Sequence, residues 1–415
     1  MKKVHYSWYI ILVGGLLMFG MSAQQMSQSV FMPQVADSLN IGMGTVSLAF
    51  SISHLLVIVL PSVVAILYQK YPMRIMACIA AAAQGLSLIL MSVANHLSLV
   101  VIACALEAYA ISSFMGVLSS TIIKRWFKDR GQFAYNLILF LSMMGGVVFT
   151  PIAGVLIEIL DWRIAYRALA VFVFVIEIPV TLLFMKEYPA QLGLKPYEDP
   201  NAAENNVIQN RPTMNADVTV RGSWRSAAFY FMCLYAVALG FSSTLQNHVV
   251  RHLENLGYSS SFGAMVVSAG MAGGLIGRVI LGFASEKFGL KAASAVYCMI
   301  GAAATAALCF AGNMGPAVVV VMGFLFGLVV RVSTVLASMM KYRIFGASDD
   351  YAGIVANTFI VTGILNAPSS VIFGYLYDIN GTYTGSFIFV AVMFAVSIML
   401  AGILLKDEKR VNPKV

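Results

Sequence analysis

Long apolar runs separated by short polar breaks make up most of this chain. Twelve of these runs have about 20 residues or more, the length that an α-helix needs to cross a bilayer. The pattern predicts an all-α polytopic membrane protein with twelve transmembrane helices, at residues 8–30, 44–68, 74–94, 97–123, 132–158, 164–185, 226–250, 260–284, 290–312, 315–339, 351–377 and 384–405.

One longer polar stretch, residues 186–225, interrupts the pattern and is rich in Pro and Asn. We expect it to be a cytoplasmic linker between an N-terminal six-helix half (1–185) and a C-terminal six-helix half with a short cytoplasmic tail (226–415). A constant offset of 217 residues aligns similar residues of the two halves: Lys70 with Lys287, Arg74 with Lys291, Gly146 with Gly363, Pro151 with Pro368, Asp161 with Asp378, and Tyr166 with Tyr383. This offset indicates a duplication that relates two pseudo-symmetric halves.

The composition and the charges agree with a membrane protein. Hydrophobic residues make up 60% of the 415 residues and charged residues only 11%, which excludes an ordinary soluble domain. If both termini are cytoplasmic, only Arg163, Arg167 and Arg251 of the 26 Lys and Arg residues fall on the outer side, and two more lie within spans. We therefore expect a multi-pass protein of the cell membrane with both termini cytoplasmic. The net charge of +8 then reflects topology and requires no nucleic acid partner.

Two arginines, Arg278 and Arg331, lie inside predicted spans. A guanidinium stays charged in hydrocarbon, so water, an acidic partner or an anionic substrate must face it. Both arginines continue stripes of glycine at four-residue spacing: Gly270, Gly274, Arg278 and Gly282 in one span, and Gly323, Gly327 and Arg331 in another. Such a stripe favours either a closely packed helix or an open cavity beside it.

The segment Gly282-Phe-Ala-Ser-Glu286-Lys287-Phe-Gly289-Leu-Lys291 resembles the loop signature of the major facilitator superfamily. The resemblance implies the fold of that superfamily, with the substrate site near the midplane between the halves. Because Glu286 can meet a helix N-terminus in one state and release it in another, we expect this loop to act as a gate. The alternative is a plain, positively charged turn. The copy of the loop in the first half departs from the signature, with Gln69 in place of the acid and Pro72 in place of a glycine.

Three further segments together resemble the branch of monocarboxylate transporters and oxalate/formate antiporters. They are Arg125-Trp126-Phe127-Lys128-Asp129-Arg130-Gly131, Asp161-Trp162-Arg163 and Gln191-Leu-Gly193-Leu-Lys195-Pro196. The resemblance implies that Arg278 holds the carboxylate of the substrate; a bond to helix-end carbonyls is the alternative. The helix 11 lysine of oxalate/formate antiporters falls on Gly363 here. Arg331 is therefore our candidate for the second charge, or else the partner of Glu107 across the halves.

Other polar residues within spans are candidates for binding and coupling. Gln24, Gln25 and Gln28 can hydrogen-bond a carboxylate, or they can satisfy one another between packed helices. Glu107 is the first candidate for proton coupling, and His54 is the second, with a packing role as its alternative. We expect Glu177, on a peripheral helix, to be mainly a protonated acid.

These features predict a secondary transporter that moves a small organic anion, a mono- or dicarboxylate, by alternating access, as proton symporter or anion exchanger. The alternatives are a neutral or amphipathic solute with the arginines as structural gates, or a transport-like sensor. The sequence contains no phosphate-binding loop, Gly-x-Ser-x-Gly or His-Glu-x-x-His motif, so we expect no enzyme. The five cysteines all fall in spans without metal-binding spacing, and we expect no cofactor and a monomer.

Overall fold

The computed structural model describes residues 5–128, 131–198, 218–346, 348 and 350–405. In these ranges the regular structure is helical, and one isolated bridge joins Phe127 and Tyr197. Twelve helices are long and apolar enough to cross a membrane, which confirms the predicted fold class: Tyr6–Met26, Met43–Lys70, Met73–Ser92, Leu97–Trp126, Phe133–Ile159, Trp162–Phe184, Ala227–Asn255, Ser260–Ser285, Leu290–Cys309, Pro316–Phe345, Gly353–Asn380 and Thr384–Leu404.

The chain divides into two compact units. Unit 1 comprises Met1–Ile41 and Thr45–Ile208, and unit 2 comprises Gly42–Gly44 and Gln209–Val415. Many large apolar side chains remain exposed, such as Phe283 at 70% and Ile379 at 78%. Helices that satisfy their own backbone groups and expose apolar side chains fit a lipid environment.

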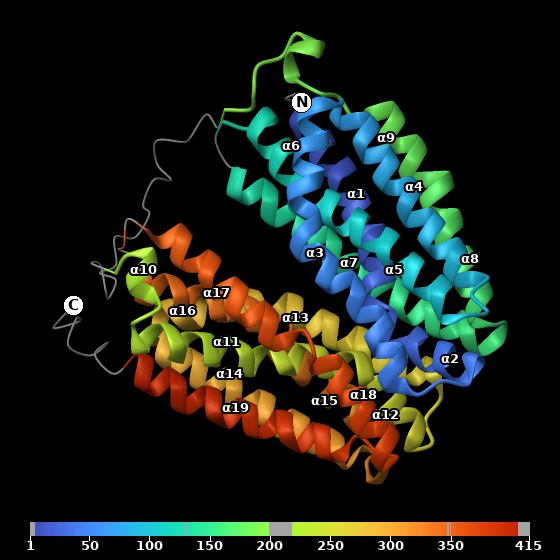
Figure 1. The fold of residues 1–415 in the computed structure, drawn as a ribbon, viewed down its shortest axis with the longest axis vertical. Coiled ribbons are helices and arrows are strands. Elements are labelled where there is room, and N and C mark those ends of the chain that lie inside the picture. Colours follow the sequence, from blue (N-terminus) through green and yellow to red (C-terminus); the bar gives the residue numbers. More distant parts are fainter. Residues whose placement is uncertain (1–4, 129–130, 199–217, 347, 349, 406–415) are drawn as a thin grey trace. The chain divides into compact units, whose positions relative to one another are not determined.

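In unit 1 the first spans are α1 (Tyr6–Met26), which α2 (Gln28–Leu39) extends after a break at Ser27, then α3 (Met43–Lys70) and α4 (Met73–Ser92). The fourth span runs through α5 (Leu97–Ile111), the π-helix η1 (Ser112–Leu118) and α6 (Ser119–Trp126). The fifth is α7 (Gly131–Ile159), and the sixth runs through α8 (Trp162–Phe172), the π-helix η2 (Val173–Glu177) and α9 (Ile178–Phe184). Helix α1 packs against α7, and α4 packs against α5 and α8 (Figure 1).

Two short helices lie between the sixth and the seventh span. They are η3 (Pro189–Leu192), which belongs to unit 1, and α10 (Val220–Ser223), which belongs to unit 2. The seventh span runs through α11 (Ala227–Leu245), η5 (Gln246–His248) and α12 (Val249–Asn255), followed by α13 (Ser260–Phe288), α14 (Leu290–Cys309) and η6 (Ala311–Asn313). Two spans are interrupted, with α15 (Pro316–Val330) followed by α16 (Ser333–Phe345), and α17 (Tyr351–Asn366) by α18 (Ser369–Asn380). The last helix, α19 (Thr384–Leu404), lies beside α14 and α11 (Figure 1).

Candidate functional site

The glycine stripes of α13 and α15 form a close contact between these two helices. A Cβ atom added to Gly327 would collide with the backbone of Gly270, and one added to Gly277 would lie 2.5 Å from the backbone oxygen of Leu328. Between packed helices, glycine allows such backbone approach because it has no side chain to hold the helices apart. Along this contact the glycines therefore allow α13 and α15 to pack closely, which is one of the two roles that their spacing predicts.

Arg331 lies at the end of this contact, where the tenth span is interrupted. It is the C-cap of α15, and Val332 separates it from α16. The Cβ and Cγ atoms of Arg331 lie against Gly274, and Arg278 follows Gly274 by one helical turn on α13. The two arginine side chains therefore start from neighbouring turns of adjacent helices in unit 2.

Neither guanidinium has a hydrogen bond or an ion pair within the part of the chain that the structure describes. The Nε atoms of Arg278 and Arg331 are buried without an acceptor, although both residues are partly exposed overall. An arginine that keeps its charge without a carboxylate partner favours an anion that binds from outside the chain.

Sequence reasoning missed three polar residues at the two helix interruptions of unit 2. Ser333 donates a hydrogen bond to the backbone oxygen of Val330, and Ser243 on α11 donates to the same oxygen over 3.4 Å. Asn366 ends α17, and its Oδ1 atom is buried without a donor. Its side chain lies against Gly240, one turn before Ser243, so one face of α11 contacts both interruptions. Pro368, two residues after Asn366, marks the interruption of the eleventh span in the sequence. Nothing in the sequence marks the interruption at Arg331.

Glu107 and Gln28, two of the predicted residues, meet in unit 1. The Gln28 amide donates to both carboxyl oxygens of Glu107, at 3.3 and 3.5 Å, and both residues are buried. The Gln24 amide donates to Ser87 Oγ over 2.9 Å, while Gln25 is half-buried. Gln24 and Gln28 thus bond to other residues, and the three glutamines do not satisfy one another.

His54 lies apart from this pair. It is exposed on α3, and its Nδ1 atom lies 3.4 Å from the backbone oxygen of Phe50, one turn earlier on the same helix. The structure gives His54 no contact with Glu107 or Gln28 among the bonds that it describes. This local contact tests neither role, so the coupling role of His54 and its packing alternative both stay predictions.

The predicted gate segment comprises the end of α13, the single connecting residue Gly289 and the start of α14. Gly289, the N-cap of α14, has φ 83° and ψ 155°, a conformation that only glycine adopts readily. Lys287 and Lys291 are exposed on either side, and a Cβ added to Gly282 would meet nothing within 4 Å. The side chain of Glu286 lies outside the described part of the structure, so its expected contact with a helix N-terminus stays a prediction.

Two of the segments that carried the family resemblance lie together in unit 1. Glu187, just after α9, forms an ion pair with Arg125 and accepts a hydrogen bond of 2.7 Å from the first backbone N–H of α4, at Met73. Gln191 accepts a hydrogen bond from the Glu187 backbone over 2.9 Å, and the Arg125 guanidinium lies 4.6 Å from the centre of the Tyr188 ring. The carboxylate therefore links the end of the fourth span to the start of α4.

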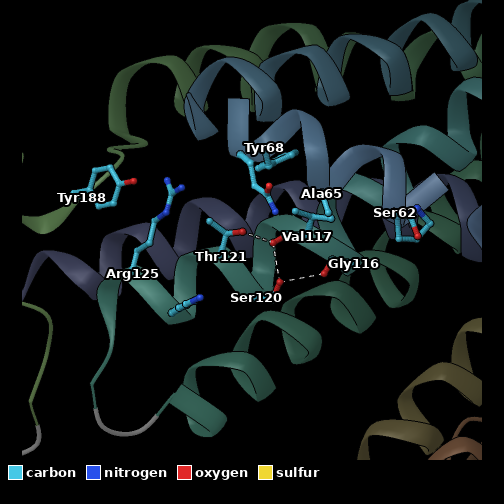
Figure 2. Close-up of a pocket in the computed structure, with 12 residues that line it drawn as sticks. Ser62, Ala65, Tyr68, Gly116, Val117, Ser120, Thr121, Arg125 and Tyr188 are labelled. Atoms are coloured by element: carbon cyan, nitrogen blue, oxygen red, sulfur yellow. Dashed lines mark hydrogen bonds between the residues drawn. The ribbon is translucent and has the colours of Figure 1, made fainter. Parts of the chain in front are cut away.

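Beside this ion pair a pocket of about 840 Å³ opens between α3 and the η1–α6 segment (Figure 2). Pro61, Tyr68 and Gln69 line it from α3, with Gly116 and Lys124 opposite. Two hydroxyls of its lining are engaged within their own helix, as Figure 2 shows for Ser120 and Thr121, which both donate to the backbone oxygen of Val117. These two hydroxyls are therefore not free to donate to a molecule in the pocket.

The twelve spans, the interrupted helices and the charged residues held within them are typical of a membrane transporter. The sequence matches the model of the Major Facilitator Superfamily over residues 11–343, and the chain belongs to that superfamily. No curated protein sequence matches the chain.

Two similar solved structures agree with this assignment. The nucleoside transporter NupG has a TM-score of 0.72 at 10% identity, over 98% of this chain and 100% of that one. A bacterial homologue of the human lysosomal transporter Spinster, in an inward-facing and occupied conformation, has a TM-score of 0.71 at 12% identity, over 99% of both chains. At these identities the similarity establishes the fold alone.

Proposed function

We propose that this transporter moves a small organic anion, a mono- or dicarboxylate, across the cell membrane by alternating access. One observation carries the proposal: Arg278 and Arg331 start from neighbouring turns of α13 and α15, and neither guanidinium has a partner among the described residues. Removing a fixed cation from water is costly, and a carboxylate held by the planar fork of arginine offsets that cost. The segments that resemble monocarboxylate and oxalate/formate transporters support the same class of substrate.

The proposed roles differ between the residues. Arg278 holds one carboxylate of the substrate, and Arg331 supplies a second positive charge at the helix interruption. Ser243 and Ser333, whose hydroxyls lie 3.4 Å apart beside this interruption, donate to the Val330 backbone oxygen and connect α11 to the interrupted tenth span. Of the three glutamines in the first span, Gln25 is the one without a bonded partner among the described residues, and it is the neutral donor that we assign to the substrate.

Coupling distinguishes the two transport modes that we propose. In proton symport, Glu107 is the carrier: its carboxyl is buried, and the Gln28 amide stabilises the ionised form when the proton leaves. Anion exchange needs no such carrier, because one anion neutralises the arginines on the way in and another on the way out. The segment from Gly282 to Lys291, where α13 connects to α14, is the proposed gate, and both termini face the cytoplasm in this proposal.

Uptake by purified protein in proteoliposomes tests the proposal directly. A panel of mono- and dicarboxylates is compared with nucleosides, the neutral solutes named for the similar structure NupG. Each solute is measured with and without a pH gradient, and again with an unlabelled anion inside. We expect carboxylate uptake in at least one condition and no nucleoside uptake.

Matched variants connect this uptake to the site. Arg278→Gln is expected to lower uptake by about tenfold or more, and Arg278→Lys to restore only part of it, because an ammonium lacks the bidentate fork. Arg221→Gln removes an exposed cation from the same unit and serves as the control. If Arg278→Gln transports carboxylates as well as Arg221→Gln does, the arginine is a structural gate and the assignment of an anionic substrate is wrong.

A further inference from the structure

The pocket between α3 and the η1–α6 segment is positively charged at one end. Figure 2 shows Tyr188 and Arg125 at this end, and small or apolar residues at the other, among them Ala65 and Val117. Lys124 precedes Arg125 on α6 and lines the same pocket. The described lining contains these two cations and no Asp or Glu. The charge and the polarity of the pocket therefore change along its length.

Only one of the two cations is neutralised by the chain. Arg125 forms an ion pair with Oε1 of Glu187, and Oε2 of the same carboxylate accepts the backbone N–H of Met73. Lys124 is exposed and has no hydrogen bond or ion pair among the described residues. Since Glu187 is already engaged through both oxygens, the charge of Lys124 is left for an anion from outside the chain.

Two further side chains of the lining are free to donate hydrogen bonds. The Gln69 amide and the Tyr188 hydroxyl are exposed, and neither has a hydrogen bond within the part of the chain that the structure describes. Together with Lys124 they offer donors to a ligand that carries mainly acceptors. An ionised phosphate group is such a ligand, and its hydrogen bonds with an ammonium group are strong because both partners are charged.

The wall that α3 forms continues into an exposed apolar face. This helix is buried over only 22% of its apolar stretch, a smaller share than in any other described span. Ile66 is 64% exposed and lies one turn from both Ser62 and Gln69, which line the pocket. Residues at this spacing share one side of a helix. A molecule that enters the pocket therefore meets apolar side chains on α3 directly beside it.

We propose that this pocket binds an anionic phospholipid, with the phosphate at Lys124 and an acyl chain beside Ala65 and the exposed face of α3. A small soluble anion would leave the apolar end unused, and a lipid without net charge would leave Lys124 unpaired. Basic pockets between transmembrane helices are a known way to bind anionic headgroups on the cytoplasmic side. The volume of about 840 Å³ is in the range of ligand pockets. Only the choice of the cytoplasmic leaflet depends on the proposed orientation.

Native mass spectrometry of the purified protein in detergent tests the site without any transport substrate. Phosphatidylglycerol and phosphatidylcholine with identical acyl chains are added in increasing amounts, and the lipid-bound fractions give the two affinities. We expect Lys124→Gln to weaken phosphatidylglycerol by about tenfold, the loss expected for one charge-assisted hydrogen bond, and to leave phosphatidylcholine unchanged. Lys70→Gln is the control, because Lys70 is an exposed cation at the end of α3 that does not line the pocket. Equal losses in the two variants would reduce the effect to general surface charge and overturn the proposal.

A second pair of variants tests the apolar end. Ala65→Phe fills the pocket and should weaken phosphatidylglycerol to the affinity of phosphatidylcholine. Val63→Phe adds a ring to an exposed position on another side of α3 and should bind the lipid as wild type does. Thermal unfolding without added lipid checks that both variants are folded. If Ala65→Phe does not fold, phosphatidylglycerol with a photoreactive acyl chain decides instead: labelling of wild type outside α3 and the η1–α6 segment overturns the proposal.

Soluble phosphates separate a lipid site from a site for free anions. Inorganic phosphate and glycerol 3-phosphate should not displace phosphatidylglycerol at concentrations where the lipid saturates the pocket. Displacement by either one at the affinity of the lipid would show that the site binds soluble anions, and the lipid assignment would be wrong. Equal affinity of wild type for phosphatidylglycerol and phosphatidylcholine would also overturn it. None of these results depends on carboxylate uptake, so this site and the proposed function can fail independently.

Discussion

The second and fourth spans of unit 1 correspond, at the offset of 217 residues, to the eighth and tenth spans of unit 2, yet the two pairs pack differently. In unit 2 the pair α13 and α15 meets backbone to backbone through glycine. In unit 1 a pocket of about 840 Å³ opens between α3 and the η1–α6 segment, which meet through side chains such as Tyr68 and Ser113, 2.7 Å apart. Arg278 corresponds to Pro61, and Arg331 corresponds to Phe114.

This comparison shows which features of the duplication are shared and which belong to one half. The interruption at Arg331 in the tenth span and the π-helix η1 in the fourth span occupy corresponding positions. A helix irregularity is therefore common to both halves, whereas the glycine contact and the two arginines occur only in unit 2. The asymmetry suits a fixed anion site in one half, because close packing of α13 and α15 holds the two cations in one place.

Gly327→Ala is the change expected to have the largest effect. The added methyl group would collide with the backbone of Gly270, and neither helix backbone can turn aside as a side chain can. Overpacking of this kind costs about 3 kcal/mol, so we expect a clear fall in the temperature of thermal unfolding in detergent. Gly282→Ala on α13 is the control, because its methyl group would meet nothing within 4 Å. Equal unfolding temperatures for the two variants would show that α13 and α15 are not in close contact.

Arg331→Gln is expected to change stability and transport in opposite directions. Removing a cation whose Nε is buried without an acceptor should raise the free energy of unfolding by about 1 kcal/mol, since the desolvation cost disappears. Uptake of carboxylate should fall by about tenfold or more, because the second positive charge is lost. Thermal unfolding and proteoliposome uptake on the same preparation check both effects. A variant that loses stability instead would indicate a structural partner for Arg331.

Gly289→Ala compares the two turns that follow the second and eighth spans. Gly289 has φ 83°, while the corresponding Pro72 has φ −58°, so only the turn in unit 2 requires glycine. We expect Gly289→Ala to lower the free energy of unfolding by about 1 kcal/mol, and Pro72→Ala to change it less. Thermal unfolding of both variants measures the difference. A larger loss in Pro72→Ala would contradict the assigned turn conformations.

The sequence predicts most of the fold but little of the detailed site. Runs of apolar residues define the twelve spans because the length of a hydrophobic stretch alone decides whether it can cross a bilayer. The interruption after Asn366 is visible in the sequence because Pro368 cannot continue the hydrogen-bonding ladder. The one at Arg331 has no such mark, and its contact with Ser243 comes from another helix, which the local sequence does not reveal. The Gln28–Glu107 bond joins residues 79 positions apart, and only tertiary packing brings them together.

Gly116→Ala is expected to have the smallest effect of these substitutions. It tests the pocket between α3 and the η1–α6 segment in unit 1. Gly116 corresponds to Ser333 in unit 2, and its added methyl group would lie 3.6 Å from Pro61, an ordinary van der Waals distance. We expect the free energy of unfolding to change by less than about 0.5 kcal/mol and carboxylate uptake to stay at the level of wild type. The two glycine positions, Gly116 and Gly327, then differ in their tolerance of one methyl group because only one of them lies where two backbones touch. A Gly116→Ala variant as damaged as Gly327→Ala would mean that α3 and η1 also close tightly during transport, and that the pocket belongs to one state of the cycle.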